Sequence, residues 1–334
     1  MVNHRLTRRA FAAGAGASLL GLVGCAVEEG EVRRIPPQTR NAVLRHWLSI
    51  PGGWRLDSAS PLQPQRPAGA RVNFIQPVGV AARNDILLVA DAGARMIWRY
   101  DRPRDALAPF TSFTGSVGEA GASLQLGNDL SAWVALPADH QVVQYDLRGQ
   151  VVRRFASPAD APRPVSVVVP QDRAEILVGD AATARVVIFD PLGGPREVLG
   201  GTRPAMLQSI TAMALGPGGL YVLDRVAQQV VLLDRRGVPV EVIGEQQLVQ
   251  PRALAVDASG RVFVSDDMEQ RIKVFRGRTL LASFGGAGQA PGRFGRIDSM
   301  ALVGNMLYVA DSLNARVEVL LVAPPSLETP EAPK

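Results

Sequence analysis

Short runs of apolar residues recur along this chain, and every recurrence has the same internal order. Leu307 to Leu321 reads LYVADSLNARVEVLL, which is an apolar run, a polar turn, and a second run in which apolar and polar residues alternate. Related segments begin at Leu87, Ile176, Leu220 and Val262, and a divergent one begins at Trp133. Alternation marks a strand with one buried face, so two runs across a polar turn predict a β-hairpin.

The spacing of one acidic position gives the size of the repeat. An aspartate closes the first run of five hairpins, whereas the second repeat has Ala135 there. The five aspartates are Asp91, Asp180, Asp224, Asp266 and Asp311. They lie 42 to 45 residues apart, except for a first interval of 89 residues that holds two repeats. With a further apolar run before and after most hairpins, the pattern predicts an all-β, six-bladed β-propeller of four-stranded antiparallel blades.

The sixth repeat lacks a fourth strand of its own. After Leu321 the chain enters a proline-rich tail, residues 323–334. Near the N-terminus, residues 41–50 (NAVLRHWLSI) resemble the outer strands of the other repeats. We expect this segment to complete the last blade, because an open seam would leave unpaired strand edges. The predicted propeller domain therefore covers residues 41–322.

The first strands carry small residues near their start. Counted from the proline that opens the strand, the second residue is Gly79, Ser166 or Ala253, and Ala212 stands there in the repeat that lacks the proline. Innermost strands crowd around the axis of a propeller, which favours small side chains. Met300 departs from the pattern in the sixth repeat.

One segment resembles a known repeat family. Residues 284–303 (FGGAGQAPGRFGRIDSMALV), followed by LYVADSLNARVEVL, are similar to an NHL repeat, which has a glycine-rich turn, a Gly-x-Phe, an aspartate-bearing strand and an Asn-x-Arg-Val hairpin. Repeats five and six match well, repeats one, three and four match in their second half, and repeat two hardly matches. The resemblance implies a six-bladed propeller. A YWTD-type propeller is the alternative, which LYVLD and LYVAD also suggest, whereas the paired motifs of WD40 repeats are absent.

The repeated charged residues have an architectural interpretation. Four hairpins carry an arginine after the turn, and the fourth repeat has Gln229 instead; the arginines are Arg95, Arg185, Arg271 and Arg316. We expect these arginines to pair with the repeat aspartates or with loop carbonyls. The Asp266-Asp267 pair has the same explanation, because Asp266 is the aspartate of its repeat.

Residues 1–24 have the features of an export signal. Arg8, Arg9 and Phe11 lie in TRRAF, which resembles a twin-arginine motif, and the apolar run 12–23 is too short to span a bilayer. The segment LVGC ending at Cys25 resembles a lipobox, and Cys25 is the only cysteine. The resemblance implies a periplasm-facing bacterial lipoprotein, lipidated at Cys25, with residues 25–40 as a tether. An ordinary secretory signal that contains a cysteine is the alternative.

Charge argues against a nucleic-acid partner. The net charge of +5 includes three arginines of the signal, which has no acidic residue, so about +2 remains on the exported chain. The basic residues alternate with acids instead of forming a stripe. We expect a monomer that contacts a membrane through its lipid and binds no nucleic acid.

Motifs for catalysis or metal binding are missing from the sequence. After the signal only two histidines remain, His46 in the proposed closing strand and His140 in the second repeat, and no zinc-site spacing occurs. The glycine-rich GGAGQAPG is followed by no helical pattern, so we interpret it as a turn between repeats and not as a phosphate cradle. We expect no catalytic residue, cofactor or metal.

The loops that enter each repeat differ from one another, unlike the hairpins. Antiparallel order places the loops before the first strands and the hairpins between the second and third strands on one face, which we call the entry face. Its predicted polar residues are Gln76, Asn128, Asp129, His140, Arg163, Gln208, Arg252 and Asp298. Variable polar loops on a rigid scaffold are typical of a recognition surface, and solvated strand caps give the same pattern.

Two classes of function fit these features. The first is a non-catalytic scaffold that binds an envelope protein or peptide. The second is a hydrolase or lyase, lactonase-like or amidating-lyase-like, with a metal on the propeller axis. The enzyme would need ligands that converge on the axis, whereas Asn128, Asp129 and Asp298 are scattered along the sequence. We therefore favour the binding module.

Overall fold

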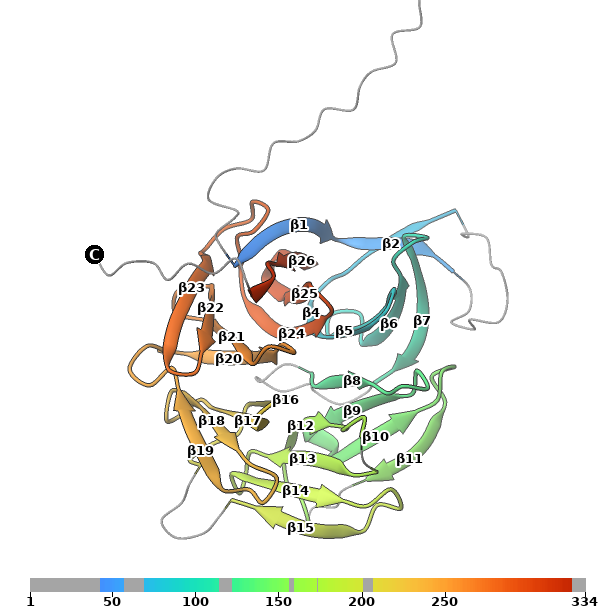
Figure 1. Ribbon diagram of the computed structural model, residues 1–334. Coiled ribbons are helices and arrows are strands. Elements are labelled where there is room, and N and C mark those ends of the chain that lie inside the picture. Colours follow the sequence, from blue (N-terminus) through green and yellow to red (C-terminus); the bar gives the residue numbers. More distant parts are fainter. Residues whose placement is uncertain are drawn as a thin grey trace, which may run out of the picture. The chain divides into compact units, whose positions relative to one another are not determined.

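The computed structural model describes residues 43–56, 69–113, 122–155, 159–172, 174–200 and 207–325. They form six β-sheets set around a common axis, as Figure 1 shows. This confirms the six-bladed propeller. No helix among the described residues is long and apolar enough to cross a membrane. The predicted signal and lipidation residues Arg8, Arg9, Phe11 and Cys25 lie outside the described residues.

Blades two to five are four-stranded antiparallel sheets of consecutive strands, and their innermost strands lie side by side around the axis. From the axis outward, blade two contains β8 (Leu124–Leu126), β9 (Ala132–Leu136), β10 (Gln141–Tyr145) and β11 (Val151–Phe155). Blade three contains β12 (Pro164–Val168), β13 (Ile176–Asp180), β14 (Arg185–Phe189) and β15 (Pro195–Leu199). Blade four contains β16 (Ala212–Gly216), β17 (Gly219–Asp224), β18 (Gln229–Leu233) and β19 (Pro239–Ile243). Blade five contains β20 (Pro251–Val256), β21 (Arg261–Asp266), β22 (Arg271–Arg276) and β23 (Thr279–Gly285).

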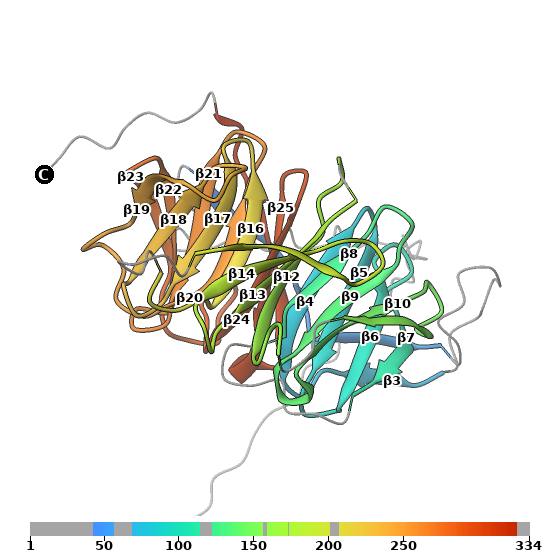
Figure 2. The same ribbon diagram turned by 90° about the horizontal axis from the view of Figure 1, so that it is seen from below.

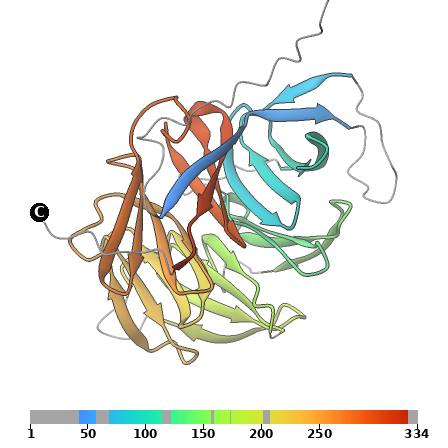
Figure 3. The same cartoon turned by 45° about the horizontal axis from the view of Figure 1, so that its top comes forward.

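Blade six joins the two ends of the described chain. Its three C-terminal strands are β24 (Ile297–Val303), β25 (Met306–Asp311) and β26 (Arg316–Val322). The fourth strand is β1 (Leu44–Ile50), which pairs antiparallel with β26 from Leu44–Val322 to Ile50–Val317. Figure 3 shows β1, in blue, crossing beside the red strands of blade six. The prediction that an N-terminal strand closes the ring is confirmed.

Buried polar groups reinforce this closure. Glu318 of β26 is fully buried, and its carboxylate lies 2.7 Å from His46 Nε2 of β1. Ser49 of β1 donates a hydrogen bond to the same carboxylate at 2.8 Å, and Arg316 approaches its other oxygen at 2.8 Å. Because a buried carboxylate needs such partners, the contacts fix the position of β1 on β26.

Blade one is larger than the sequence predicts. Its four blade strands are β4 (Pro77–Arg83), β5 (Ile86–Asp91), β6 (Met96–Asp101) and β7 (Ala106–Ser112). Two strands extend it at the outer edge, β2 (Gly52–Arg55) and β3 (Arg71–Asn73), and β2 pairs parallel with β7. The sequence Pro51-Gly52-Gly53 follows β1, and the chain continues through it directly into β2 of the next blade. Gly53 lets the backbone pass close to Asp105, because a Cβ there would lie 2.9 Å from the Asp105 carbonyl oxygen.

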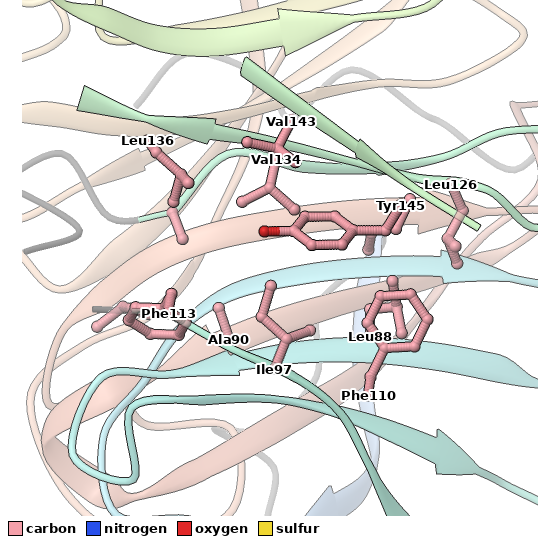
Figure 4. Packing of buried hydrophobic residues seen from close by; sticks show 14 of the residues in the cluster. Leu88, Ala90, Ile97, Phe110, Phe113, Leu126, Val134, Leu136, Val143 and Tyr145 are labelled. Atoms are coloured by element: carbon pink, nitrogen blue, oxygen red, sulfur yellow. The ribbon is translucent and has the colours of Figure 1, made fainter. Parts of the chain in front are cut away.

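The core is divided among the six junctions between neighbouring blades. Each junction holds its own cluster of buried apolar side chains. Figure 4 shows the cluster between blades one and two, where Ile97 and Phe113 face Val134 and Leu136. Figure 2 shows the blades from the side, stacked face to face. Stability therefore comes from contacts between successive blades, as in other repeat architectures.

The register of the innermost strands corrects one detail of the sequence analysis. Ile297 faces Asp311, as Pro77 faces Asp91, so the residue of β24 equivalent to Gly79 is Ser299 and not Met300. The small residue is thus present in blade six, one position earlier than expected. The Ser299 hydroxyl accepts a hydrogen bond from the Val80 N–H of blade one at 3.2 Å. In this position a small polar side chain joins two innermost strands.

Candidate functional site

The repeat aspartates tie the entry loops to the hairpins. All five are fully buried at the end of the second strand of their blade. In blade five, the Asp266 carboxylate accepts hydrogen bonds from the N–H groups of Val249 at 2.9 Å and Gln250 at 3.1 Å. Asp91, Asp180, Asp224 and Asp311 accept equivalent bonds from the loop that enters their own blade. The hydrogen bonds of these carboxylates are made within each blade, so the carboxylates do not face an open site.

The turn after each aspartate corrects the assignment of Arg95. The last turn residue is left-handed in every hairpin, at Arg95, His140, Ala184, Gln228, Gln270 and Ala315. In blade one the residue that faces Asp91 is Met96, whereas Arg185, Arg271 and Arg316 face the aspartates of their own blades. Arg95 therefore belongs to the turn, one residue before the position of the other arginines.

The remaining arginines do not share one set of partners. Arg316 lies 3.3 Å from Asp311 and donates to the loop carbonyls of Gln289 and Arg293, as expected. In blade five the cation beside Asp266 is instead Lys273, at 3.0 Å. Burial acts to raise the pKa of Asp266, but the hydrogen bonds from the loop and from Lys273 together hold it below the usual range.

Blade two departs from this arrangement. Leu136, which faces Gln141, occupies the aspartate position, so the sequence analysis placed this position one residue too early at Ala135. The turn that follows is the short 3₁₀ helix η2 (Pro137–Asp139), which has a counterpart in η3 (Ser312–Asn314) of blade six. His140 follows η2, exposed, and its Nδ1 contacts the carbonyl oxygen of Pro162 in the loop that enters blade three. A contact between neighbouring blades thus accompanies the missing aspartate.

A cavity of about 850 Å³ lies along the axis, lined by the innermost strands of all six blades. Three of its serine hydroxyls bridge neighbouring blades: Ser123 accepts from Val167 N–H at 3.1 Å, Ser166 from Met213 N–H at 3.0 Å, and Ser299 from Val80 N–H. Among the described residues that line the cavity, none is a histidine. No group of three or more His, Cys, Asp or Glu in the described part of the chain is arranged to hold a metal.

Two residues predicted on the open entry face are instead buried in the cavity wall. Arg252 of β20 forms an ion pair with Asp267, and its Nη1 lies 3.4 Å from Asp298 Oδ1. Arg296 Nε reaches the other oxygen of Asp298 at 2.9 Å. Burial raises the pKa of Asp267, although the Arg252 cation opposes the shift. The arginine and Asp298 therefore join blades five and six, and the expectation that they are exposed loop residues is wrong.

Asn128 and Asp129, which were also predicted on the entry face, lie on the opposite face of the ring. Asn128 and Asp129 follow β8, the first strand of blade two, so they belong to the turn between its first and second strands. That turn is at the far end from the entry loops. Asn128 accepts a hydrogen bond from Arg83 of blade one. Burial would raise the pKa of Asp129, but bonds from Ser131 and the nearby charge of Arg83 lower it.

Four predicted side chains remain at the entry face, the exposed His140 and three others. Gln76 is half-buried, whereas Arg163 and Gln208 are exposed. Their backbone N–H groups bind Asp91, Asp180 and Asp224 respectively, at 2.9, 2.5 and 2.6 Å. The structure thus brings the backbone of these loops into the scaffold and leaves their side chains available at its surface.

The sequence analysis missed an apolar feature of this face. Five large apolar side chains on the entry loops and hairpins of blades four, five, six and one are 41% to 64% exposed: Ile75, Val226, Val249, Met268 and Leu313. We call these five residues the crown. Val226, Met268 and Leu313 occupy the same position, two residues after the repeat aspartate. In blade one that position is Gly93, and Ile75 packs where its side chain would lie.

Variation at one position of the repeated hairpin could have indicated the crown from the sequence. Its hairpin position reads Gly93, Ala182, Val226, Met268 and Leu313 in the five aspartate-bearing repeats, so it varies within a repeated segment. Scattered exposed apolar residues are common, but a group at equivalent positions on one face is characteristic of an interaction surface. The variation was hidden because the whole hairpin was assigned to the scaffold.

Comparisons with known proteins support the fold alone. No protein-family description matches the chain, and no curated protein matches it in sequence. A solved protein of unknown function from Bacteroides thetaiotaomicron is 14% identical, with a TM-score of 0.58 over 84% of this chain and 76% of that one. A Kuenenia stuttgartiensis hydrazine synthase chain is 11% identical, with a TM-score of 0.56 over 77% and 98%. A streptogramin B lyase is 10% identical, with a TM-score of 0.55 over 75% and 95%. This chain is thus a six-bladed β-propeller, and the NHL resemblance stays a prediction.

Proposed function

We propose that this protein is a non-catalytic binding module of the bacterial envelope, a periplasm-facing lipoprotein held by Cys25, that binds a protein or peptide on its entry face. The crown is the observation that carries the proposal. Its side chains extend from hairpin tips and entry loops whose backbone is held by buried aspartates, so the surface is ordered before a partner arrives. A preorganised apolar surface binds with less loss of conformational entropy than a flexible one.

The surroundings of the crown fit a protein partner. Charged groups lie close to it, because Asp267 and Glu269 flank Met268, and Arg225 precedes Val226. Protein interfaces combine apolar centres with a polar rim of this kind. The NHL resemblance agrees with this interpretation, since it implies a propeller scaffold and supplies no catalytic residues.

Binding by crown variants tests the proposal. The chain from residue 25 onward is immobilised and exposed to envelope extract, and the retained partner is identified and then titrated in purified form. The double change Met268→Asp with Leu313→Asp should weaken partner binding at least tenfold. Val240→Asp is the matched control, because Val240 is also 61% exposed but lies on the outer strand of blade four. Equal affinity of both variants for the partner would refute a role for the entry face.

A second candidate is a hydrolase or lyase that works in the axial cavity. The cavity itself favours it, together with solved neighbours named as lyases, one of them a catalytically inactive variant of virginiamycin B lyase from Staphylococcus aureus with quinupristin. A metal on the axis would need side chains that converge there, and the described residues hold no such group. Metal analysis of the purified chain separates the candidates: a stoichiometric metal would favour the enzyme.

A further inference from the structure

Exposed tryptophan is concentrated at the start of the described chain. Of the four tryptophans, Trp98 is half-buried and Trp133 is buried, whereas Trp47 of β1 is 45% exposed and Trp54 of β2 is 40% exposed. Leu48 beside Trp47 is 37% exposed. The strands β1 and β2 run in succession along the outer rim of blades six and one (Figure 1). Their exposed aromatic side chains contribute little to the interior of the ring.

Cations accompany both indole rings. The Arg102 guanidinium lies over Trp47, 5.6 Å from its ring centre, and that of Arg71 lies 5.8 Å from Trp54. Arg45 and Arg55 are exposed on the same two strands. In contrast to Arg71 and Arg102, which pair with Asp105 and Asp85, Arg45 and Arg55 have no acidic partner among the described residues. Their charges are therefore available to an anion from outside.

Tryptophan beside arginine suits the surface of a phospholipid bilayer. Indole rings favour the level of the headgroups, and a guanidinium binds phosphate through two parallel hydrogen bonds. The place of these residues in the chain favours the same partner. β1 begins 19 residues after Cys25, and 19 residues of chain reach about 65 Å at most, or roughly 25 Å on average for a random coil. A lipid on Cys25 would thus keep β1 and β2 close to the membrane.

We propose that Arg45, Trp47, Leu48, Trp54 and Arg55, which we call the rim patch, dock on an anionic phospholipid surface and hold the ring in a defined orientation. The orientation rests on the proposed lipoprotein, but the affinity of the rim patch for lipid does not. Two contacts on one short chain reinforce each other, since the anchored lipid raises the local concentration of the patch at the membrane. A weak intrinsic affinity is therefore sufficient.

Vesicle binding without the anchor tests the rim patch directly. The chain from residue 25 onward, which contains every described residue, is prepared with Cys25→Ser so that no lipid can be attached. It is sedimented with vesicles of phosphatidylethanolamine and phosphatidylglycerol at physiological ionic strength. We expect measurable binding that falls at least fivefold for Trp47→Ser with Trp54→Ser. Brominated phospholipids should quench the tryptophan fluorescence of the unchanged patch, which requires contact with the bilayer.

A charge variant and a control keep the test decisive if the tryptophan variant folds poorly. Arg45→Glu with Arg55→Glu should remove the preference for phosphatidylglycerol over neutral vesicles, and Val240→Asp should bind like the parent. Equal vesicle binding by the parent and both patch variants, or no binding by the parent, would overturn the proposal. Loss of the protein partner by the patch variants without loss of vesicle binding would also overturn it. Partner binding by the crown variants is measured without vesicles, so its outcome does not affect the vesicle-binding result. The rim-patch proposal and the proposed function can therefore fail independently.

Discussion

Two side chains on one hairpin of blade five lie two residues apart and have opposite environments. Asp266 is fully buried and binds the loop that enters its blade, whereas Met268 is 57% exposed and belongs to the crown. The same contrast separates Asp311 from Leu313 in blade six. A repeated hairpin therefore contains both a scaffold position and a surface position. The fold restricts the residue type at the buried scaffold position but not at the exposed surface position. Repetition identifies the hairpin but does not assign every side chain in it to the architecture.

Replacing the buried member should have the largest effect. Asp266→Ala removes the acceptor of two loop N–H groups and the partner of Lys273, whose side chain is 6% exposed. Buried groups left without partners lower stability, so we expect a loss of about 2 to 4 kcal/mol in the free energy of unfolding, measured with urea. Met268→Ala is the control on the same hairpin. A loss as large for the control would abolish the distinction between scaffold and crown.

Two of the buried repeat aspartates, Asp266 and Asp311, should contribute to stability with opposite pH dependence. The pKa of Asp266 lies below its usual value because hydrogen bonds and Lys273 outweigh burial, whereas burial raises the pKa of Asp311 despite the bonds from Asn314 and the loop. Asp266 thus contributes stability above the pKa it has in the unfolded chain, and this is lost as the pH falls through the folded value. Asp311 contributes most below its unfolded pKa and less as the pH rises through the folded value.

Urea unfolding of Asp266→Asn and Asp311→Asn between neutral and acidic pH measures this difference. The destabilisation caused by Asp266→Asn should shrink as the pH falls, and that caused by Asp311→Asn should grow. Parallel changes in the two variants would mean that Asp266 and Asp311 are electrostatically equivalent. The effect is smaller than complete removal of the carboxylate, because asparagine keeps one acceptor oxygen for the loop.

The smallest effect on stability should come from the crown. Val226→Ser with Met268→Ser should change the free energy of unfolding by less than about 0.5 kcal/mol per site, because both side chains point into solvent. The same variant should bind less of a fluorescent hydrophobic dye, since two of the five apolar side chains are gone. Unchanged dye binding would show that the crown does not act as one apolar surface.

Most of the fold was predictable because it depends on a period. Alternating strands, the spacing of aspartates and the missing last strand together specified six blades and the closing role of residues 41–50. The strands β2 and β3 were not predicted, because their pairing depends on the free edge of β7 in three dimensions and leaves only the glycines 52 and 53 as a trace. Ser299 was missed for a different reason. Ile297 stands where the first strands of blades one, three and five have a proline, so the residue from which the position was counted is absent in blade six.

The candidate site was less predictable, because burial of polar residues depends on partners far away in the sequence. Arg252 resembles an exposed loop arginine until Asp267 and Asp298 are seen to enclose it. Asn128 changed faces because β8 (Leu124–Leu126) precedes it, so the first strand of blade two begins earlier than its placement in the entry loop required. Apolar residues at hairpin tips match no catalytic or metal-binding motif. The crown is therefore recognised only from the exposed fractions of its side chains in the structure.

The pairing of β1 with β26 also has a mechanical consequence. Leu44 lies beside Val322 at the end of blade six away from the entry face, and β1 runs from there toward that face. Tension between the chain before Val43 and a partner held on the entry face would therefore act along β1. Such a load is shared by all the hydrogen bonds between the two strands, with the buried Glu318 near the end that lies toward the entry face, and does not open them one after another. The seam of the ring is in this way oriented to resist shear in the direction in which a tethered propeller would be pulled.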